Sequence, residues 1–181
     1  MDTVRVDEAL KQLTNAARRR QSEDGAWRFC FESGPMTDAF MIVLLCTLNI
    51  DDKLLIRRLA ERIAARQDRT GPWKLYADEA DGNLSATVES YYALLASGLF
   101  SRHDKRMKAA RQFIRQQGGL ASAGPMTKAL LALTGQMLWP KRFKIPLEIM
   151  LLPSSFPINF YDFSGYARVH LTPIFLAADR K

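Results

Sequence analysis

Apolar residues recur along the first part of the chain at the spacing of an amphipathic helix. They stand at positions 6, 10, 13 and 17, with basic and polar residues between them. Such spacing places one apolar stripe along a helix, so that one face is buried and the other is solvated. Residues 55–63 and 107–114 repeat the pattern. The sequence therefore predicts three amphipathic helices.

A nearly continuous apolar segment follows each amphipathic one. These segments are MTDAFMIVLLCTL at 36–48, LSATVESYYALLASGLF at 84–100 and PMTKALLALTGQML at 125–138. A helix that is apolar on nearly all sides is expected to be buried on all sides. The chain shows neither the alternating pattern of a half-buried strand nor the turn signals of a hairpin, so a β fold is excluded.

The chain thus alternates half-exposed helices with buried helices three times. Helical hairpins of this kind, laid side by side, generate an outer ring of amphipathic helices and an inner ring of apolar ones. We therefore predict an all-α fold of the α/α-barrel (toroid) type. An open helical solenoid is the alternative, although its inner helices would normally keep one polar face.

A seven-residue motif, Q-x-x-x-G-x-W, occurs twice, each time after an amphipathic helix. It reads QSEDGAW at 21–27 and QDRTGPW at 67–73. The glycine supplies the backbone freedom that a helix C-terminus requires, and the indole covers the junction while its N–H finds an acceptor. The glutamine side chain can form a hydrogen bond with the exposed end of a neighbouring secondary-structure element, or it can stack on the indole. We interpret the motif as a structural clip between repeats, formed by Gln21, Gly25, Trp27, Gln67, Gly71 and Trp73.

Charge and composition limit the kinds of partner that this protein is expected to bind. The formal net charge is +7, but the basic residues fall within amphipathic helices and match no nucleic-acid-binding module, so no nucleic-acid partner is expected. A basic exterior does suit an anionic membrane surface. No apolar run is long enough to span a bilayer, and the N-terminus is not a targeting segment. Cys30 and Cys46 lack metal-ligand spacing and are expected to be reduced thiols, so a cytoplasmic protein without metal or cofactor is predicted.

Two such motifs after amphipathic helices resemble the QW repeats of the squalene–hopene and related triterpene cyclases. A third copy, RQFIRQQGGL, keeps Gln116 and Gly119 but lacks the tryptophan. The likeness continues through DGNLSATVESYYALLASG at 81–98 and PLEIMLLPSSFPINFYDFSGYARVHLTPI at 146–174, and so covers almost the entire chain. It is greatest to the branch that cyclises tetraprenyl-curcumene-type substrates, the sporulenol-synthase-like enzymes.

This resemblance implies class II terpene cyclisation, in which a carboxylic acid protonates an alkene and a carbocation cascade forms fused rings. Such a site needs an activated acid, aromatic faces that stabilise cations, and a cavity that excludes water. The D-x-D-D acid motif of the family, which its members carry in a second barrel, does not occur in residues 1–181. The resemblance therefore implies that residues 1–181 are the N-terminal part of an α/α-barrel domain, an incomplete barrel with no catalytic residue and no activity of its own.

The resemblance also marks positions of a substrate cavity. Tyr166 in NFYDFSGYAR stands where the hopene cyclases carry a cavity tryptophan, and Trp139 matches a family aromatic after the third apolar segment. A tyrosine packed between helices is the structural alternative for Tyr166. The implied partners are a polyprenoid hydrocarbon substrate, a membrane surface with peripheral or monotopic association, and the remainder of the cyclase.

Three charged residues, Asp38, Glu89 and Lys128, each lie within an otherwise apolar segment, one per repeat. A charge in such a helix is unfavourable unless it is paired. If the inner helices are neighbours, Glu89 can meet Lys128 with Asp38 nearby, either as a structural ion pair or as a catalytic relay. In the family, Glu89 matches a buried glutamate, and Lys128 stands where hopene cyclases carry arginine.

Two other classes of function remain open. One is a non-catalytic helical-repeat fragment, or truncated gene product, that serves as a binding or structural module. The other is a protein-prenyltransferase-like or different α/α-barrel binding module. The Q-x-x-x-G-x-W motifs and the lack of zinc-ligand spacing disfavour this second class.

Overall fold

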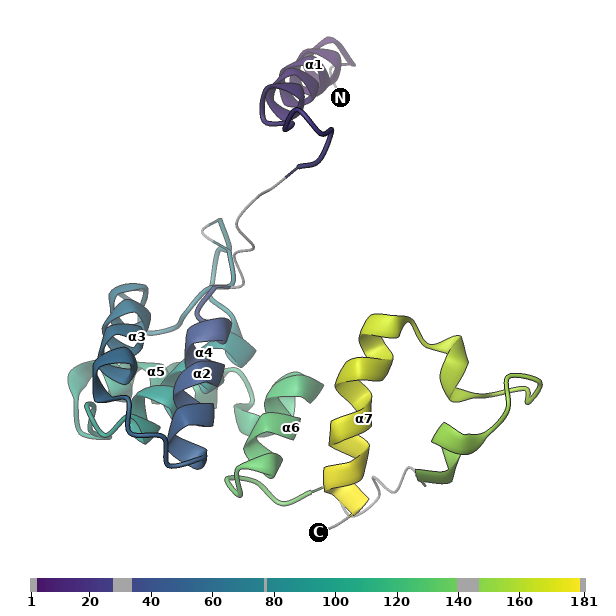
Figure 1. The fold of residues 1–181 in the computed structure, drawn as a ribbon. Coiled ribbons are helices and arrows are strands. Elements are labelled where there is room, and N and C mark those ends of the chain that lie inside the picture. Colours follow the sequence, from purple (N-terminus) through teal and green to yellow (C-terminus); the bar gives the residue numbers. More distant parts are fainter. Residues whose placement is uncertain (1–2, 28–33, 77, 140–146, 180–181) are drawn as a thin grey trace. The chain divides into compact units, whose positions relative to one another are not determined.

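The computed structural model describes residues 3–27, 34–76, 78–139 and 147–179 (Figure 1). The chain divides into two compact units, residues 1–33 and residues 34–181. The first unit contains helix α1 (Thr3–Arg19), which confirms the first predicted amphipathic helix. In the described residues every regular secondary-structure element is a helix, and β structure is limited to two isolated bridges. The all-α class is therefore confirmed.

The described residues of the second unit form six α-helices and three short 3-10 helices. The α-helices are α2 (Met36–Thr47), α3 (Lys53–Ala65), α4 (Leu84–Ala96), α5 (Lys105–Gln116), α6 (Pro125–Leu133) and α7 (Gly165–Asp179). The 3-10 helices are η1 (Gly119–Ser122), η2 (Leu147–Leu151) and η3 (Phe160–Asp162). Helices α3 and α5 correspond to the predicted amphipathic segments, whereas α2, α4 and α6 correspond to the apolar ones.

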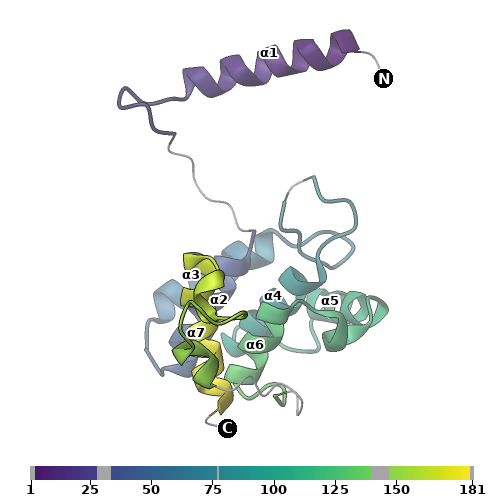
Figure 2. The same cartoon turned by 90° about the vertical axis from the view of Figure 1, so that its right-hand side faces the viewer.

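The apolar helices lie side by side, as the alternating pattern predicts. Helix α4 packs against α2 and also contacts α6, and both α3 and α5 pack against α4 (Figures 1 and 2). The core forms where these helices meet, around fully buried Ile42, Ile63 and Met107. The amphipathic α3 and α5 turn their basic residues outward and their small apolar residues, such as Ala60 and Ala110, inward.

The three apolar helices end earlier than their hydrophobic runs suggest. Each stops two residues before a residue with positive φ: Asn49 at 53°, Gly98 at 70° and Gly135 at 72°. A left-handed residue at this position reverses the chain and lets the following N–H groups bond the last helical carbonyls. The N–H of Ile50, for example, donates to the carbonyl of Leu45 over 2.9 Å.

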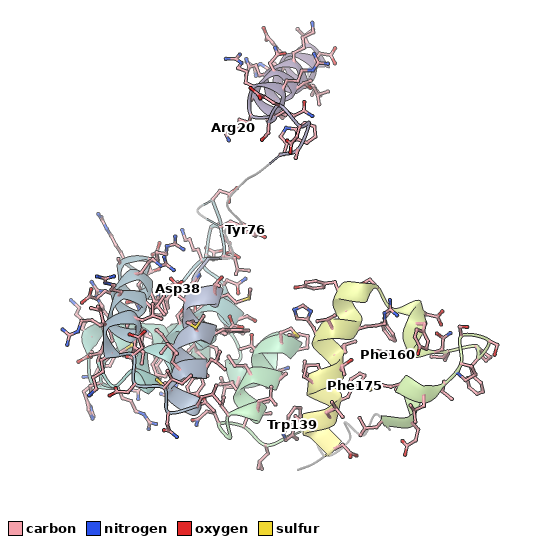
Figure 3. All side chains as sticks on the ribbon, in the orientation of Figure 1. Arg20, Asp38, Tyr76, Trp139, Phe160 and Phe175 are labelled. Atoms are coloured by element: carbon pink, nitrogen blue, oxygen red, sulfur yellow. The ribbon has the colours of Figure 1, made fainter. Side chains whose placement is uncertain are left out.

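The C-terminal part of the second unit is built around α7. The 3-10 helices η2 and η3 contact one another, and η2 also contacts α7. The rings of Phe160 in η3 and Phe175 in α7 lie 6.5 Å apart between centroids (Figure 3).

No helix among the described residues has both the length and the apolar character to cross a bilayer. Cys30 lies outside the described residues, and burial raises the pKa of the half-buried Cys46 thiol.

Candidate functional site

The two Q-x-x-x-G-x-W segments form the same hydrogen-bonded turn. The indole N–H of Trp73 donates to the carbonyl of Ile63 over 2.7 Å, and that of Trp27 donates to the carbonyl of Ala17 over 2.8 Å. Both carbonyls lie two residues before the end of their helix, α3 or α1, where an α-helix leaves carbonyls without an internal donor. Each carbonyl also accepts a hydrogen bond from a backbone N–H, that of Arg66 or Arg20, so the indole is a second donor at the end of the preceding helix.

The glutamine closes the turn in both segments, and in the second segment the glutamine and glycine also contact a neighbouring helix. Gln67 Nε2 donates to the carbonyl of Gly71 over 2.7 Å, just as Gln21 Nε2 does to that of Gly25. Gln67 Nε2 also lies 3.1 Å from the carbonyl oxygen of Arg106 in α5. A Cβ on Gly71 would come within 2.8 Å of the backbone of Ala109 in α5. The second segment therefore connects α3 to α5.

Asp38 is paired with the outer helix α3. Its carboxylate is buried at the start of α2 and accepts hydrogen bonds from Nε of Arg62, over 2.6 Å, and from Nη2 of the same guanidinium. Bidentate pairs of this kind are the strongest arginine–carboxylate contacts. The hydrogen bond and the charge of Asp38 raise the pKa of the Arg62 guanidinium.

Glu89 has a different partner from the one expected. Its Oε1 accepts a 2.6 Å hydrogen bond from the hydroxyl of Thr127, and both residues are buried between α4 and α6. Desolvation raises the pKa of Glu89, and the hydrogen bond from Thr127 opposes this only in part. In the described part of the chain, no ion pair within 4.0 Å joins Glu89 to Lys128.

The expected network of Asp38, Glu89 and Lys128 is therefore not formed as one cluster. Consecutive residues of an α-helix point about 100° apart, because 3.6 residues complete a turn. Since Thr127 faces α4, Lys128 is turned away from Glu89. It lines a cavity on another side of α6.

This cavity, of about 270 Å³, lies between α6 and α7. Lys128 is its one charged lining residue among those described, and Trp139 contributes an aromatic ring (Figure 3). The other lining residues are Pro125, Met126, Ala129, Ala132, Met137, Leu171 and Ile174. We name it the Trp139 cavity. Its lining suits a hydrocarbon ligand, since small-molecule sites are concave and mostly apolar.

Tyr166 does not line the Trp139 cavity. It lies in the first turn of α7, is 77% exposed, and packs on His170 with ring centroids 4.1 Å apart. Tyr166 lies five positions before Leu171, which turns it about 140° away from the cavity side of α7. The i, i+3 spacing of Leu171 and Ile174 is the sequence signal that marks the cavity side.

Residues 10–181 match the family model of the squalene–hopene cyclase N-terminal domain. The chain therefore belongs to this family, as the QW-like motifs suggested. It is 44% identical over 173 residues to sporulenol synthase of Bacillus subtilis (strain 168), which covers 94% of this chain and 27% of that protein. It is 30% identical over 176 residues to a squalene–hopene cyclase of Alicyclobacillus acidocaldarius, covering 97% of this chain and 27% of the relative.

A squalene–hopene cyclase of Zymomonas mobilis is 34% identical over 170 residues, with coverage of 93% and 26%. The chain thus spans about a quarter of the length of the curated relatives it matches.

Proposed function

We propose that residues 1–181 form the N-terminal part of a class II terpene cyclase and contribute one wall of its substrate cavity. The substrate class is a linear or partly cyclised C30 or C35 polyprene, of the squalene or tetraprenyl-curcumene type. The observation that carries this proposal is the Trp139 cavity, an apolar site with one indole, in a chain of the squalene–hopene cyclase family. An aromatic face stabilises a nearby cation by about 0.5–2 kcal/mol.

The proposed role is to shape the cavity and exclude water, with the acid supplied elsewhere. The D-x-D-D motif is absent from residues 1–181. Glu89 holds its proton to higher pH than an exposed glutamate, but it does not line the Trp139 cavity and its Oε1 is occupied by Thr127. General acid catalysis requires hydrogen-bond reach to the reacting group.

The remainder of the cyclase is the proposed protein partner. Helix α2 and the residue that follows it expose a row of apolar side chains, Met41, Leu44 and Leu48, of which Leu48 is 58% exposed. Contiguous exposed apolar surface marks an interaction site. The net charge of +7 supports peripheral or monotopic association with an anionic membrane surface.

The test is retention of a hydrocarbon in the Trp139 cavity. We expect the chain, loaded with squalene from detergent and passed over a sizing column, to retain squalene detectable by mass spectrometry. Met126→Trp should abolish retention because Met126 lines the cavity, whereas Met41→Trp should not, although Met41 is similarly exposed on α2. No retention, or equal loss in both variants, would contradict the proposal.

The missing acid motif favours one alternative, a non-catalytic helical-repeat module with a binding or structural role. Such a module has no reason to retain a polyprene. The same experiment therefore separates the two proposals.

A further inference from the structure

A second groove, of about 370 Å³, lies along α5 and is separate from the Trp139 cavity. The two share no lining residue. Its floor is aliphatic and comes from three helices, with Val88 and Leu95 from α4, Ile114 from α5 and Leu131 from α6. Its rim is basic and polar, formed by Arg102, Arg111, Arg115 and Gln136. We name it the arginine groove.

The three guanidinium groups of the arginine groove have no partners among the described residues. No ion pair within 4.0 Å and no side-chain hydrogen bond involves Arg102, Arg111 or Arg115 there, and no described lining residue is acidic. Arg111 and Arg115 stand one turn apart on the same face of α5. Like charges at this spacing destabilise a helix. An anion in the groove would remove this repulsion.

Two tyrosines add further donors. Tyr91 and Tyr92 of α4 both line the groove and are half-buried. Within the described ranges, neither phenol hydroxyl has a hydrogen-bond partner, although a half-buried tyrosine usually finds one. The groove therefore combines guanidinium, phenol and amide donors above an aliphatic floor.

We propose that the arginine groove binds a phosphorylated amphiphile, with its phosphate against the arginines and its alkyl chain over the floor. A phosphate offers more oxygens and more charge than a carboxylate, and arginine binds it bidentately. An alkyl chain is the group that gains from the aliphatic floor. The volume fits a small ligand, since ligand pockets measure about 300–1,000 Å³. This site is independent of the proposed polyprene cavity.

Calorimetric titration of the chain with n-octyl phosphate, below its micelle concentration, tests the proposal. We expect n-octyl phosphate to bind at least about tenfold more tightly than inorganic phosphate or n-octanol, because both ends contribute. Arg111→Gln and Arg115→Gln should each weaken binding by about tenfold. Lys108→Gln, an exposed charge on the same helix outside the groove, should leave it within about twofold.

Leu120→Trp provides a second probe that keeps every charge. Leu120 lines the groove and is 40% exposed, so the larger ring should obstruct the alkyl chain without disturbing the core. This variant should weaken the binding of n-octyl phosphate and leave the binding of inorganic phosphate unchanged. Circular dichroism verifies that each variant is folded.

Three results would overturn the proposal. Equal affinity for inorganic phosphate and n-octyl phosphate would reduce the groove to a non-specific anion patch. Equal loss in Lys108→Gln would attribute binding to overall charge. Binding to phosphatidylglycerol vesicles without any binding of n-octyl phosphate would make the arginines a membrane-surface contact instead.

Discussion

The hydroxyl of Thr127 donates a 2.6 Å hydrogen bond to Oε1 of Glu89, and this bond joins α6 to α4. Both side chains are buried, Thr127 to 1% exposure and Glu89 to 4%. A single neutral donor compensates a buried carboxylate poorly, and for this reason the pKa of Glu89 rises above its ordinary value of 4.5. The inner helices are thus connected by a carboxyl group that keeps its proton to higher pH than an exposed glutamate does.

The raised pKa of Glu89 predicts a pH dependence of stability. The unfolded chain releases this proton near pH 4.5, whereas the folded chain retains it to higher pH. The free energy of unfolding should therefore fall as the pH rises from 4.5 through the folded pKa. Glu89→Gln should remove this decline and stabilise the chain at neutral pH. Urea unfolding from about pH 4 to pH 8 measures this change in the free energy of unfolding. Glu61→Gln, at an exposed position, is the control.

Gly71→Ala should destabilise the chain more than Gly25→Ala. Both glycines have positive φ, 116° and 80°, so alanine strains each by about 1–2 kcal/mol. At Gly71 the new Cβ also meets the backbone of Ala109 within 2.8 Å, whereas at Gly25 the nearest atom is 3.9 Å away. Overpacking adds about 1–3 kcal/mol. Thermal unfolding of both variants compares their losses of stability. Equal losses would argue against a close approach of the Gly71 turn to α5.

Arg62→Gln should destabilise the chain by leaving the buried carboxylate of Asp38 without its partner. Loss of one member of a buried pair costs about 3–5 kcal/mol, but the Arg62 side chain is 58% exposed, so we expect about 1–3 kcal/mol. Arg58→Gln on the same helix should have little effect, because Arg58 is exposed and forms no ion pair with another described residue.

A double-mutant cycle with Asp38→Asn isolates the coupling between Asp38 and Arg62. Additive effects of the two substitutions would show that the pair contributes no stability.

Residues 1–181 alone should form no cyclic product from squalene or tetraprenyl-curcumene. Protonation of an alkene requires a positioned acid, and the help of about 10²- to 10⁴-fold from such a group is lost without the D-x-D-D motif. Mass spectrometry after incubation in detergent is the measurement. Turnover would identify an acid within this chain, and Asp38→Asn and Glu89→Gln would be the variants to examine first.

The sequence by itself determined helices α1 to α6, the amphipathic or apolar character of each, and the family, whereas helix α7 was not predicted. Each of these follows from local spacing, because the i, i+3, i+4 pattern defines which side of a helix is apolar. The helix ends were predicted only approximately, because the apolar runs extend to 100 and 138 whereas α4 and α6 end just before Gly98 and Gly135. The repeated motif likewise uses short-range bonds, such as Gln67 to Gly71.

Only the tertiary structure decided the partners of the charged and aromatic candidates. Thr127 and Lys128 are consecutive residues of α6 and therefore point in different directions. Thr127 hydrogen-bonds Glu89, whereas Lys128 lines the Trp139 cavity. A similar rotation on α7 leaves Tyr166 exposed. Local spacing defines the faces of each helix, but the rotation and axial offset between two packed helices depend on the side chains of both. Partners across a helix–helix contact are therefore determined only when the helices pack.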